Sequence, residues 1–123
     1  MIRGEVKANR EAIIPLQVRG QNGQTENIEA ALDTGFTGFL TLPPSLVTAL
    51  QLPSWGSSQF TLGDGNTVVF DVYIATILWD GQEREVYALE AEGGPLVGMS
   101  LLYGFRLTAD VVDGGPVTIE ALP

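Results

Sequence analysis

One aspartate, Asp33, stands in a sequence context that could support acid–base chemistry. Residues 30–32 before it are apolar, Thr34 and Gly35 follow it, and residues 39–42 form a second apolar run. A carboxylate between two buried segments is costly unless hydrogen bonds or neighbouring charges compensate for its lost hydration. Gly35 lets the backbone approach that carboxylate closely. The context favours a positioned acid, whereas the three letters alone also fit an ordinary turn between two strands.

The composition directs attention to carboxylates. The chain has no His and no Cys. Ser–His and Cys–His nucleophile pairs, imidazole bases and the usual zinc sites are therefore excluded. If the protein is an enzyme, its Asp and Glu side chains must transfer protons or hold a hard cation. A Ca²⁺ or Mg²⁺ site needs several oxygens that converge from separate loops, and we predict neither a metal nor a cofactor.

Other aspartates compete with Asp33 for a catalytic role. Asp64 and Asp80 each precede a glycine, which is typical of turn residues. Asp71 lies between two apolar residues of an expected strand and is predicted to face solvent. Asp110 has no such simple interpretation, but nothing in the sequence places it near Asp33.

The charge distribution argues against several kinds of partner. The formal net charge is −9, and no Lys or Arg occurs between residues 20 and 83. Nucleic acid and anionic membrane surfaces are therefore disfavoured. No apolar run approaches the roughly 18 residues that span a bilayer, and residues 1–5 do not resemble a signal peptide. We expect a soluble, cytoplasmic protein.

The elements around Asp33 are predicted to be mainly strands in a single domain, residues 1–123. The 15 Gly and 7 Pro separate short runs of Val, Ile, Leu and Thr, and 45% hydrophobic residues suffice for a core. Asn22-Gly23 favours a hairpin with a primed turn, and Pro15 favours an edge or bulge position. Strands are expected at residues 1–9 (as a terminal edge strand), 12–19, 25–33, 39–42, 59–62, 67–79, 84–92, 105–112 and 116–122, short helices at 44–50 and 99–103, and a loop at 55–58.

Three features in this order resemble the retropepsin-like (retroviral-type) aspartic proteases, and especially their small bacterial single-domain members. They are the Asp-Thr-Gly of residues 33–35 after an apolar strand, a glycine-rich hairpin tip at 63–66, and the Leu-Val-Gly of 96–98 followed by Met-Ser-Leu-Leu. The similarity covers about residues 12–103. It implies a mainly β fold, namely a closed six-stranded acid-protease barrel with one or two short helices.

The resemblance also implies roles for individual residues. Asp33 matches the catalytic aspartate, Thr34 the residue whose hydroxyl braces the partner subunit's turn, and Gly35 the turn glycine. Residues implied to bind substrate are Phe36, Thr37, Gly63, Asp64, Gly65, Leu96, Val97 and Gly98. Phe36 departs from the retroviral and pepsin-type enzymes, which have a small residue here, although several of the small bacterial members have Phe, and its ring either narrows or fills the substrate groove or packs in the dimer. The segment after Leu102 is also longer than the single terminal strand of the retroviral enzymes.

Only one Asp-Thr-Gly occurs, whereas the implied reaction needs two carboxylates, one to accept a proton from water and one to donate. Pairing of two copies on a two-fold axis would supply both. We therefore predict a homodimeric aspartic endopeptidase that acts on peptides or unfolded protein. The alternative is a catalytically weak or inactive peptide-binding or assembly module. A carboxylate glycosidase is disfavoured, because so small a chain with two Trp offers little surface for sugar stacking.

Overall fold

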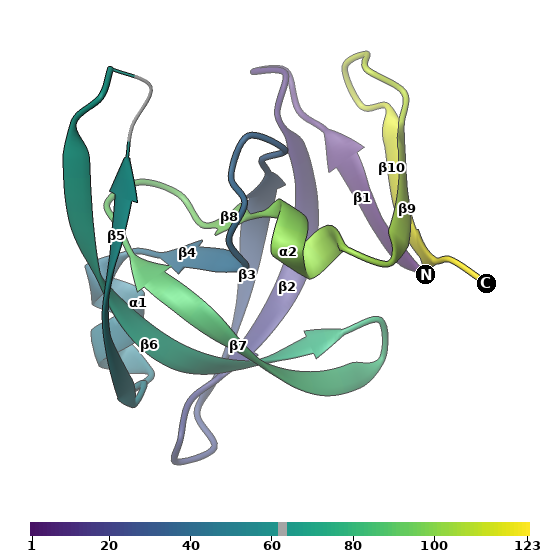
Figure 1. Cartoon of the computed structure of the whole chain (residues 1–123). Coiled ribbons are helices and arrows are strands. Elements are labelled where there is room, and N and C mark those ends of the chain that lie inside the picture. The colour runs from purple at the N-terminus through teal and green to yellow at the C-terminus, as the bar shows by residue number, and fades with distance from the viewer. Residues whose placement is uncertain (62–63) are drawn as a thin grey trace.

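The computed structural model describes residues 1–61 and 64–123, and strands dominate it (Figure 1). The elements are β1 (Ile2–Val6), β2 (Ala12–Arg19), β3 (Thr25–Leu32), β4 (Leu40–Leu42), α1 (Pro44–Ala49), β5 (Ser54–Thr61), β6 (Thr67–Trp79), β7 (Gln82–Glu90), β8 (Leu96–Val97), α2 (Met99–Leu102), β9 (Phe105–Ala109) and β10 (Pro116–Ala121). No helix in these ranges has the length and apolar character needed to cross a membrane.

Six of the strands close into a barrel. Their order is β6-β7-β4-β8-β3-β2, and the ring closes because β2 also pairs with β6 through Gln17↔Leu78 and its neighbours. Two of the pairings are parallel, β3 with β8 and β4 with β7. The two strands of each parallel pair are therefore joined by a connection that crosses from one end of the barrel to the other. The predicted mainly β fold, a closed six-stranded barrel with two short helices, is confirmed.

The barrel encloses one hydrophobic core. Its fully buried side chains come from strands on every side and from α2, and they include Ile14, Leu40, Ile77, Val97 and Leu101. Removing a methylene from such a close-packed interior loses both transfer energy and contacts. The rigid core thus fixes the ends of β3 and β8, which bear the loops described below.

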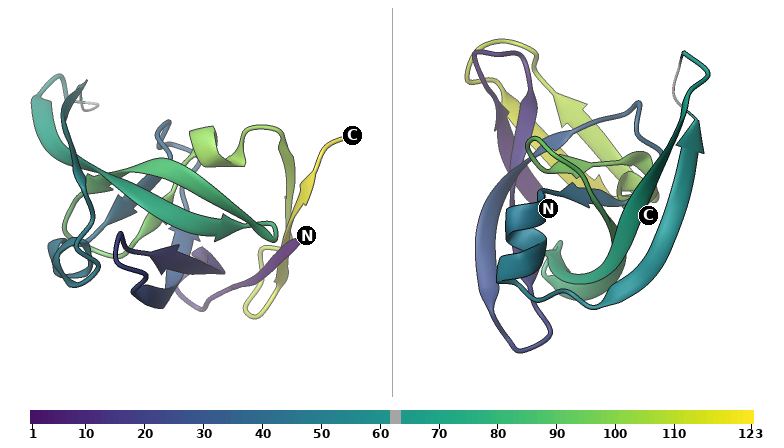
Figure 2. Two further views of the ribbon diagram at one scale, coloured as in Figure 1. Left: turned by 90° about the horizontal axis from the view of Figure 1, so that it is seen from below. Right: turned by 90° about the vertical axis from the view of Figure 1, so that its left-hand side faces the viewer.

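The remaining strands form two extensions on opposite sides of the barrel (Figures 1 and 2). On one side β5 and the first half of β6 make a projecting arm. On the other, β1 pairs with both β2 and β10, and β9 is the outermost strand. The prediction of β1 as an edge strand is wrong, because β10, which is remote in sequence, covers it through pairs such as Ile2↔Ile119.

At Pro15, strand β2 is paired with only one neighbouring strand. Pro15 pairs with Glu29 on β3, whereas β1 reaches only as far as Ile13 and β6 begins to pair at Gln17. A residue without an N–H is tolerated there because no strand on the second side needs its donor. This agrees with the predicted edge-like position.

Of two turns predicted from sequence, the one at Asp80-Gly81 is confirmed and the one at Asn22-Gly23 is not. Asp80 and Gly81 both have positive φ, 51° and 80°, as a tight primed turn between β6 and β7 requires. The turn between β2 and β3 is a longer loop in which only Gly23 has positive φ, 83°, so the predicted primed turn is wrong. The Asn22 side chain instead donates to Gln51 Oε1 at 2.7 Å beside the end of α1.

Two further boundaries are corrected. Residues 55–58 belong to β5, not to a loop, because β5 pairs with β6 around an irregularity near Gly56, whose φ is 143°. Residues 110–112 are not strand, since Val112 N–H donates to Asp110 O at 2.9 Å in a turn. Of the predicted tip at residues 63–66, Gly63 lies outside the described residues, as does Leu62.

Candidate active site

The loop that carries Asp33 begins where β3 ends. Asp33 N–H donates to the carbonyl of Val97 on β8 at 2.9 Å, which continues the parallel pairing of the two strands by one residue. Phe36 N–H then donates to Asp33 O at 3.1 Å and closes a turn. The backbone on either side of the carboxylate is therefore anchored.

The Asp33 carboxylate is oriented by its own turn. Gly35 N–H donates to Asp33 Oδ1 at 2.9 Å, and the Asp33 side chain is half-buried. A Cβ on residue 35 would lie 3.3 Å from the same oxygen, closer than such contacts usually come. The expected function of Gly35, to permit this close approach, is thus seen directly.

Residues 98–100, which follow β8, are hydrogen-bonded to the second part of the Asp33 loop. Four hydrogen bonds join residues 98–100 to residues 36–39. They are Gly98 N–H to Phe39 O (3.0 Å), Met99 N–H to Phe36 O (2.8 Å), Ser100 N–H to Gly38 O (3.1 Å) and the Ser100 hydroxyl to Thr37 O. The loop is held over its whole length, as a site that must keep a fixed geometry requires.

The ring of Phe36 packs against two glycines of this support. A Cβ on Gly98 would lie 2.6 Å from Phe36 Cδ2, and a Cβ on Gly38 would lie 2.5 Å from Phe36 Cζ. Within one chain, the ring therefore rests on the crossing segment. It forms part of the wall of the cleft beside Asp33 without filling it.

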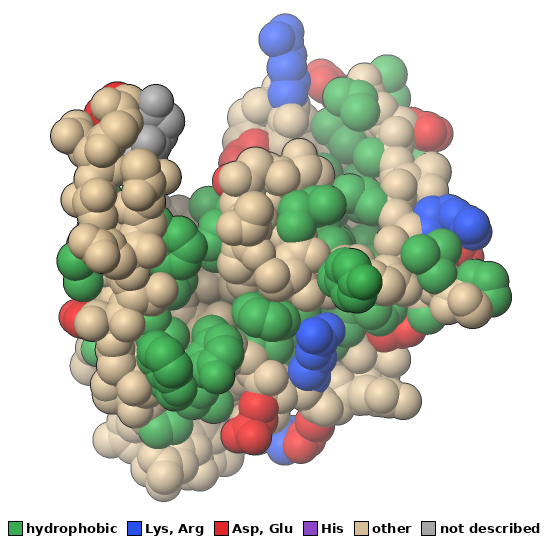
Figure 3. Space-filling view, in the orientation of Figure 1, with side chains coloured by type: hydrophobic (Ala, Val, Ile, Leu, Met, Phe, Trp, Pro, Cys, Tyr) green, Lys and Arg blue, Asp and Glu red, His purple; other side chains and the backbone are tan. Residues whose placement is uncertain are grey.

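That cleft has a volume of about 480 Å³ and lies between the arm and the body of the molecule (Figure 3). It is lined by Asp33, Gly35, Phe36, Thr37, Thr41, Phe60, Thr61, Phe70, Leu89, Ala91, Glu92 and Leu96. Apolar surface with a few polar groups is typical of ligand sites. The charged side chains among these lining residues are those of Asp33 and Glu92, both acidic, and the rest of the lining is formed by apolar residues, threonines and Gly35.

The structure brings together five of the residues predicted from sequence. Asp33, Gly35, Phe36, Thr37 and Leu96 all line the cleft. The other predicted residues lie elsewhere: Thr34 is exposed beside them, Val97 is fully buried in the core, Gly98 lies beneath Phe36, Asp64 and Gly65 lie in the exposed turn of the arm, and Gly63 is outside the described residues.

Asp64 has the structure of a turn residue. Its carboxylate accepts hydrogen bonds from the backbone N–H and the side-chain amide of Asn66, both at 2.9 Å. Gly65 between them has a φ of 86°. These local hydrogen bonds stabilise the turn at the end of the arm. Of the two aspartates, Asp33 is therefore the one that lies in the loop after β3 and lines the cleft.

Several cleft residues were missed by sequence reasoning. Phe60 and Phe70 come from the arm, with ring centroids 5.7 Å apart. Leu89 comes from the end of β7, and Ala91 and Glu92 from the segment that follows it. Alternation along residues 58–60 and 68–72 could have indicated one apolar face of the arm.

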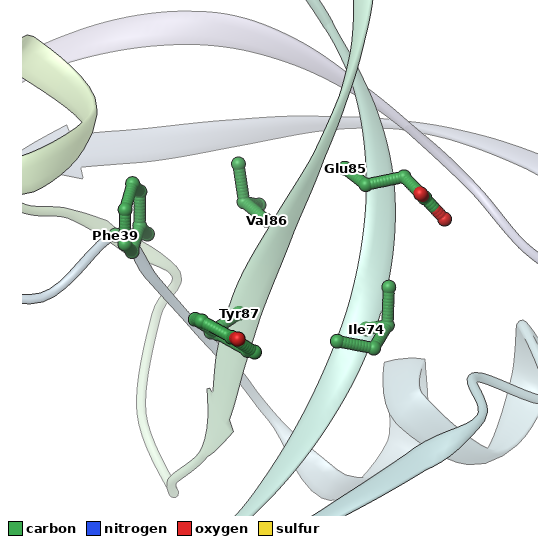
Figure 4. Close-up of a pocket in the computed structure, with 5 residues that line it drawn as sticks. All are labelled: Phe39, Ile74, Glu85, Val86 and Tyr87. Carbon is green, nitrogen blue, oxygen red and sulfur yellow. The ribbon is translucent and has the colours of Figure 1, made fainter.

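A group of aromatic side chains, Phe39, Trp55 and Tyr87, lies at the end of the loop before β4 and on β5 and β7. Figure 4 shows Phe39 and Tyr87 on one side of a surface pocket of about 360 Å³ and Ile74 and Glu85 on the other. The ring centroids of Phe39 and Tyr87 are 6.2 Å apart. The Arg84 guanidinium carbon lies 5.7 Å from the Phe39 centroid, a distance at which a cation is attracted to the ring face.

Tyr73 and Lys7 have pKa values raised by acidic neighbours. A hydrogen bond with Glu90 raises the pKa of the Tyr73 hydroxyl, and a hydrogen bond with Glu5 raises the pKa of Lys7. Within residues 1–61 and 64–123, no three His, Cys, Asp or Glu side chains group as a metal site would need.

Replacing Thr41 with Val is expected to lower the free energy of unfolding, because it removes a hydrogen bond between β4 and β8 beside the cleft. Thr41 is buried, and its Oγ1 accepts a hydrogen bond from Leu96 N–H at 3.0 Å. Valine keeps the shape and leaves that N–H without its acceptor, at a cost of about 1–3 kcal/mol. Urea unfolding of both proteins measures the difference. Equal midpoints would show that the bond contributes nothing.

Comparison with known proteins gives the fold a name. No protein-family model and no curated protein matches the sequence. Among solved structures, a retropepsin-like aspartic protease from Rickettsia conorii aligns over 98% of this chain and 90% of its own, with a TM-score of 0.56 and 13% identity. The protease of Simian Foamy Virus (mac) aligns over 72% of this chain and 90% of its own, with a TM-score of 0.48 and 20% identity. The chain therefore has the retropepsin-like fold.

Proposed function

We propose that the protein is an aspartic endopeptidase that acts as a homodimer. The observation that carries the proposal is the Asp33 carboxylate, oriented by Gly35 N–H and lying in a cleft of about 480 Å³ within a retropepsin-like barrel. The lining of the cleft includes both the Asp33 loop and Phe60, Thr61 and Phe70 of the arm, and we take its ligand to be an extended peptide. Among the described residues of the lining, the groups that could act as a base are the carboxylates of Asp33 and Glu92.

The chemistry requires a second carboxylate. One Asp33 takes a proton from water, which attacks the scissile carbonyl, while the other donates a proton to the carbonyl oxygen. A two-fold dimer would place Asp33 of each chain side by side, and Thr34, which is exposed at the loop, would brace the partner's turn. Two carboxylates at such short range share a proton, as is established for aspartic protease dyads.

The arm would close over the bound peptide. Phe60, Thr61 and Phe70 of the arm already line one wall of the cleft opposite the Asp33 loop. Residues 64–66, in the turn of the arm, would add backbone hydrogen bonds to an extended substrate, as in strand addition, and would exclude water.

Activity should have a bell-shaped dependence on pH. The pair works with one shared proton, so raising the pH removes the proton donor and lowering it protonates the acceptor. The measurement is kcat/KM for an unfolded protein substrate from acidic to alkaline pH. A rate that rises steadily into the alkaline range would contradict a carboxylate pair.

The direct test of the proposed function is cleavage of an unfolded protein with and without an inhibitor that mimics the tetrahedral transition state. We expect cleavage at acidic to neutral pH that the inhibitor suppresses. Fragments that form equally well with inhibitor present would come from another mechanism.

A peptide-binding or assembly module is the second candidate. It is favoured by Phe36, whose ring lines the cleft at a position where the retroviral and pepsin-type enzymes carry a small side chain. Sedimentation together with the cleavage assay separates the two candidates. Dimers that bind peptides but cleave none would favour the module.

A further inference from the structure

A pocket of about 510 Å³ lies between the second part of the Asp33 loop, β7 and α2. It is lined by Thr37, Phe39, Arg84, Met99, Ser100 and Tyr103, and we call it the Arg84 pocket. Two of these residues precede β4, one belongs to β7, and three lie in α2 or directly after it. The Arg84 pocket is distinct from the cleft that holds Asp33 and has Thr37 in common with it.

Arg84 has no acidic partner in the described part of the chain. Lys7, Arg19 and Arg106 each form an ion pair with a glutamate. Arg84 is half-buried, yet within residues 1–61 and 64–123 no carboxylate oxygen lies within 4 Å of its guanidinium nitrogens. Water screens a partly buried charge less than an exposed one. Arg84 is therefore available to a negatively charged group of a ligand.

The glutamates that flank Arg84 in sequence do not neutralise it. Glu83 accepts a hydrogen bond from Arg19 of β2. Glu85 lines a different pocket, and Figure 4 shows it on the side opposite Phe39, the ring against which Arg84 packs. Successive residues of a strand point to opposite faces, so both glutamates are directed away from the Arg84 side chain. The charge that Arg84 brings to the pocket is thus positive, although the net charge of the chain is −9.

The guanidinium is held in a position suited to a carboxylate. Its central carbon lies 5.7 Å from the centroid of the Phe39 ring, and the attraction between the two groups restrains the long Arg84 side chain. A guanidinium presents a planar set of N–H donors that can bind both oxygens of one carboxylate. It balances the single charge of a carboxylate, whereas a phosphate group carries close to two charges. The lining therefore favours an Asp or Glu side chain.

Exposed apolar surface lies beside this charge. Tyr103 is 86% exposed and Met99 is 45% exposed. Aromatic residues, Met and Arg are enriched where protein surfaces bind other polypeptides, because they combine a large contact area with polar or polarizable groups. Tyr103 and Met99 can pack against the methylene groups of a bound Glu and against its neighbours in the peptide.

A peptide that leaves the cleft along the Asp33 loop would reach the Arg84 pocket. Thr37 lines both cavities, and its carbonyl oxygen accepts a hydrogen bond from the hydroxyl of Ser100, which also lines the Arg84 pocket. The wall that the two cavities share is therefore fixed. A two-fold dimer would carry one such pocket in each chain.

We propose that the Arg84 pocket is an accessory substrate site, which binds a Glu or Asp side chain of the polypeptide outside the cleft. The inference rests on the proposed function, since it takes the ligand to be a peptide that also occupies the cleft. Arg84 selects the charge, and Tyr103 adds contact surface. The preference for an acid is thus expected away from the cleft, whose own charged side chains are acidic.

The test is peptide binding to the Asp33→Asn variant, which needs no catalysis. Short, dye-labelled Val/Thr-rich peptides carry one Glu that is moved through successive positions, and each is compared with the peptide that has Gln there. Fluorescence anisotropy gives the dissociation constants. We expect an outer position at which Glu binds roughly five-fold more tightly than Gln, and by less at high salt. In the cleft, Glu should bind more weakly than Gln, because Glu92 lines it.

Charge variants separate a binding role of Arg84 from a structural one. Arg84→Gln should remove the preference for Glu, and Arg84→Glu should reverse it in favour of a peptide with Lys at the same position. Arg106→Gln, which removes a cation from β9 outside both linings, should keep it. Thermal unfolding checks the fold of each variant. An arginine that only stabilised the fold would not exchange the preferred charge.

Two results would overturn the proposal. One is a preference for Glu that survives Arg84→Gln, and the other is equal affinity for the Glu and Gln peptides at every outer position. The comparison of these peptides uses no substitution in the pocket, so it decides the proposal even if an Arg84 variant does not fold.

The outcome is distinguishable from failure of the proposed function. Wild-type protein that cleaves peptides with the same KM for Glu and Gln at every outer position would leave the protease intact and refute the accessory site. A preference for Glu that depends on Arg84, without cleavage by the wild type, would support the site and refute the protease. Peptides that do not bind at all would overturn the accessory site.

Discussion

The Asp33→Asn variant is expected to lose cleavage of unfolded protein by roughly 10³-fold or more, while folding normally. Asparagine keeps the shape of the side chain and an acceptor for Gly35 N–H, which donates to Asp33 Oδ1 at 2.9 Å in the native chain. It cannot exchange a proton with water or substrate. The measurement is the initial cleavage rate at the pH optimum, with thermal unfolding as the check on folding.

Two matched variants sharpen that result. Asp71→Asn removes an exposed carboxylate from β6 outside the cleft lining and should leave the rate within about two-fold, as surface changes usually do. Glu92→Gln removes the other acid that lines the cleft. We expect it to retain most of the activity. A loss as large as that of Asp33→Asn would mean that the second carboxylate comes from the same chain.

The second large effect is expected from Gly98→Ala. A Cβ at this position would lie 2.2 Å from Gly38 O, 2.6 Å from Phe36 Cδ2 and 2.7 Å from Phe36 O. Relief requires displacement of backbone as well as of the ring, so we expect a cost of about 3 kcal/mol or more. Because the same contact supports the loop, cleavage should fall together with stability.

The matched control is Gly94→Ala, in the loop before β8. A Cβ there has no neighbour within 4 Å, and Gly94 does not have positive φ. Its urea midpoint should be close to that of the native protein, or slightly higher, since alanine restricts the unfolded chain. Equal midpoints for the two variants would contradict the tight packing of Phe36 on Gly98.

Sequence reasoning succeeded where local chemistry decides structure. The bounds of β6, Thr67–Trp79, follow from a long β-branched and aromatic run between turn residues. The primed turn at Asp80-Gly81 and the hydrogen bond from Gly35 to Asp33 also depend on neighbours in the chain. Such features are predictable because few residues determine them.

It failed where distant segments meet. The covering of β1 by β10 and the extension of β5 through residues 55–58 depend on pairings that no local pattern encodes. For the same reason the cleft residues Leu89 and Glu92 were missed, since the parallel pairing of β4 with β7 brings the end of β7 beside the loop. The packing of Phe36 on Gly98 likewise depends on the passage of residues 98–100 beneath the Asp33 loop, which the local sequence does not indicate.

The central claim is that catalysis needs Asp33 from two chains at once. The most direct test is to unfold and refold wild-type protein together with the Asp33→Asn variant and to measure cleavage per wild-type chain. If hybrid dimers are inactive, that value falls to about one half at equal mixing and further with excess variant, in proportion to the wild-type fraction. An activity per wild-type chain that stays constant at every ratio would show that a single Asp33 suffices.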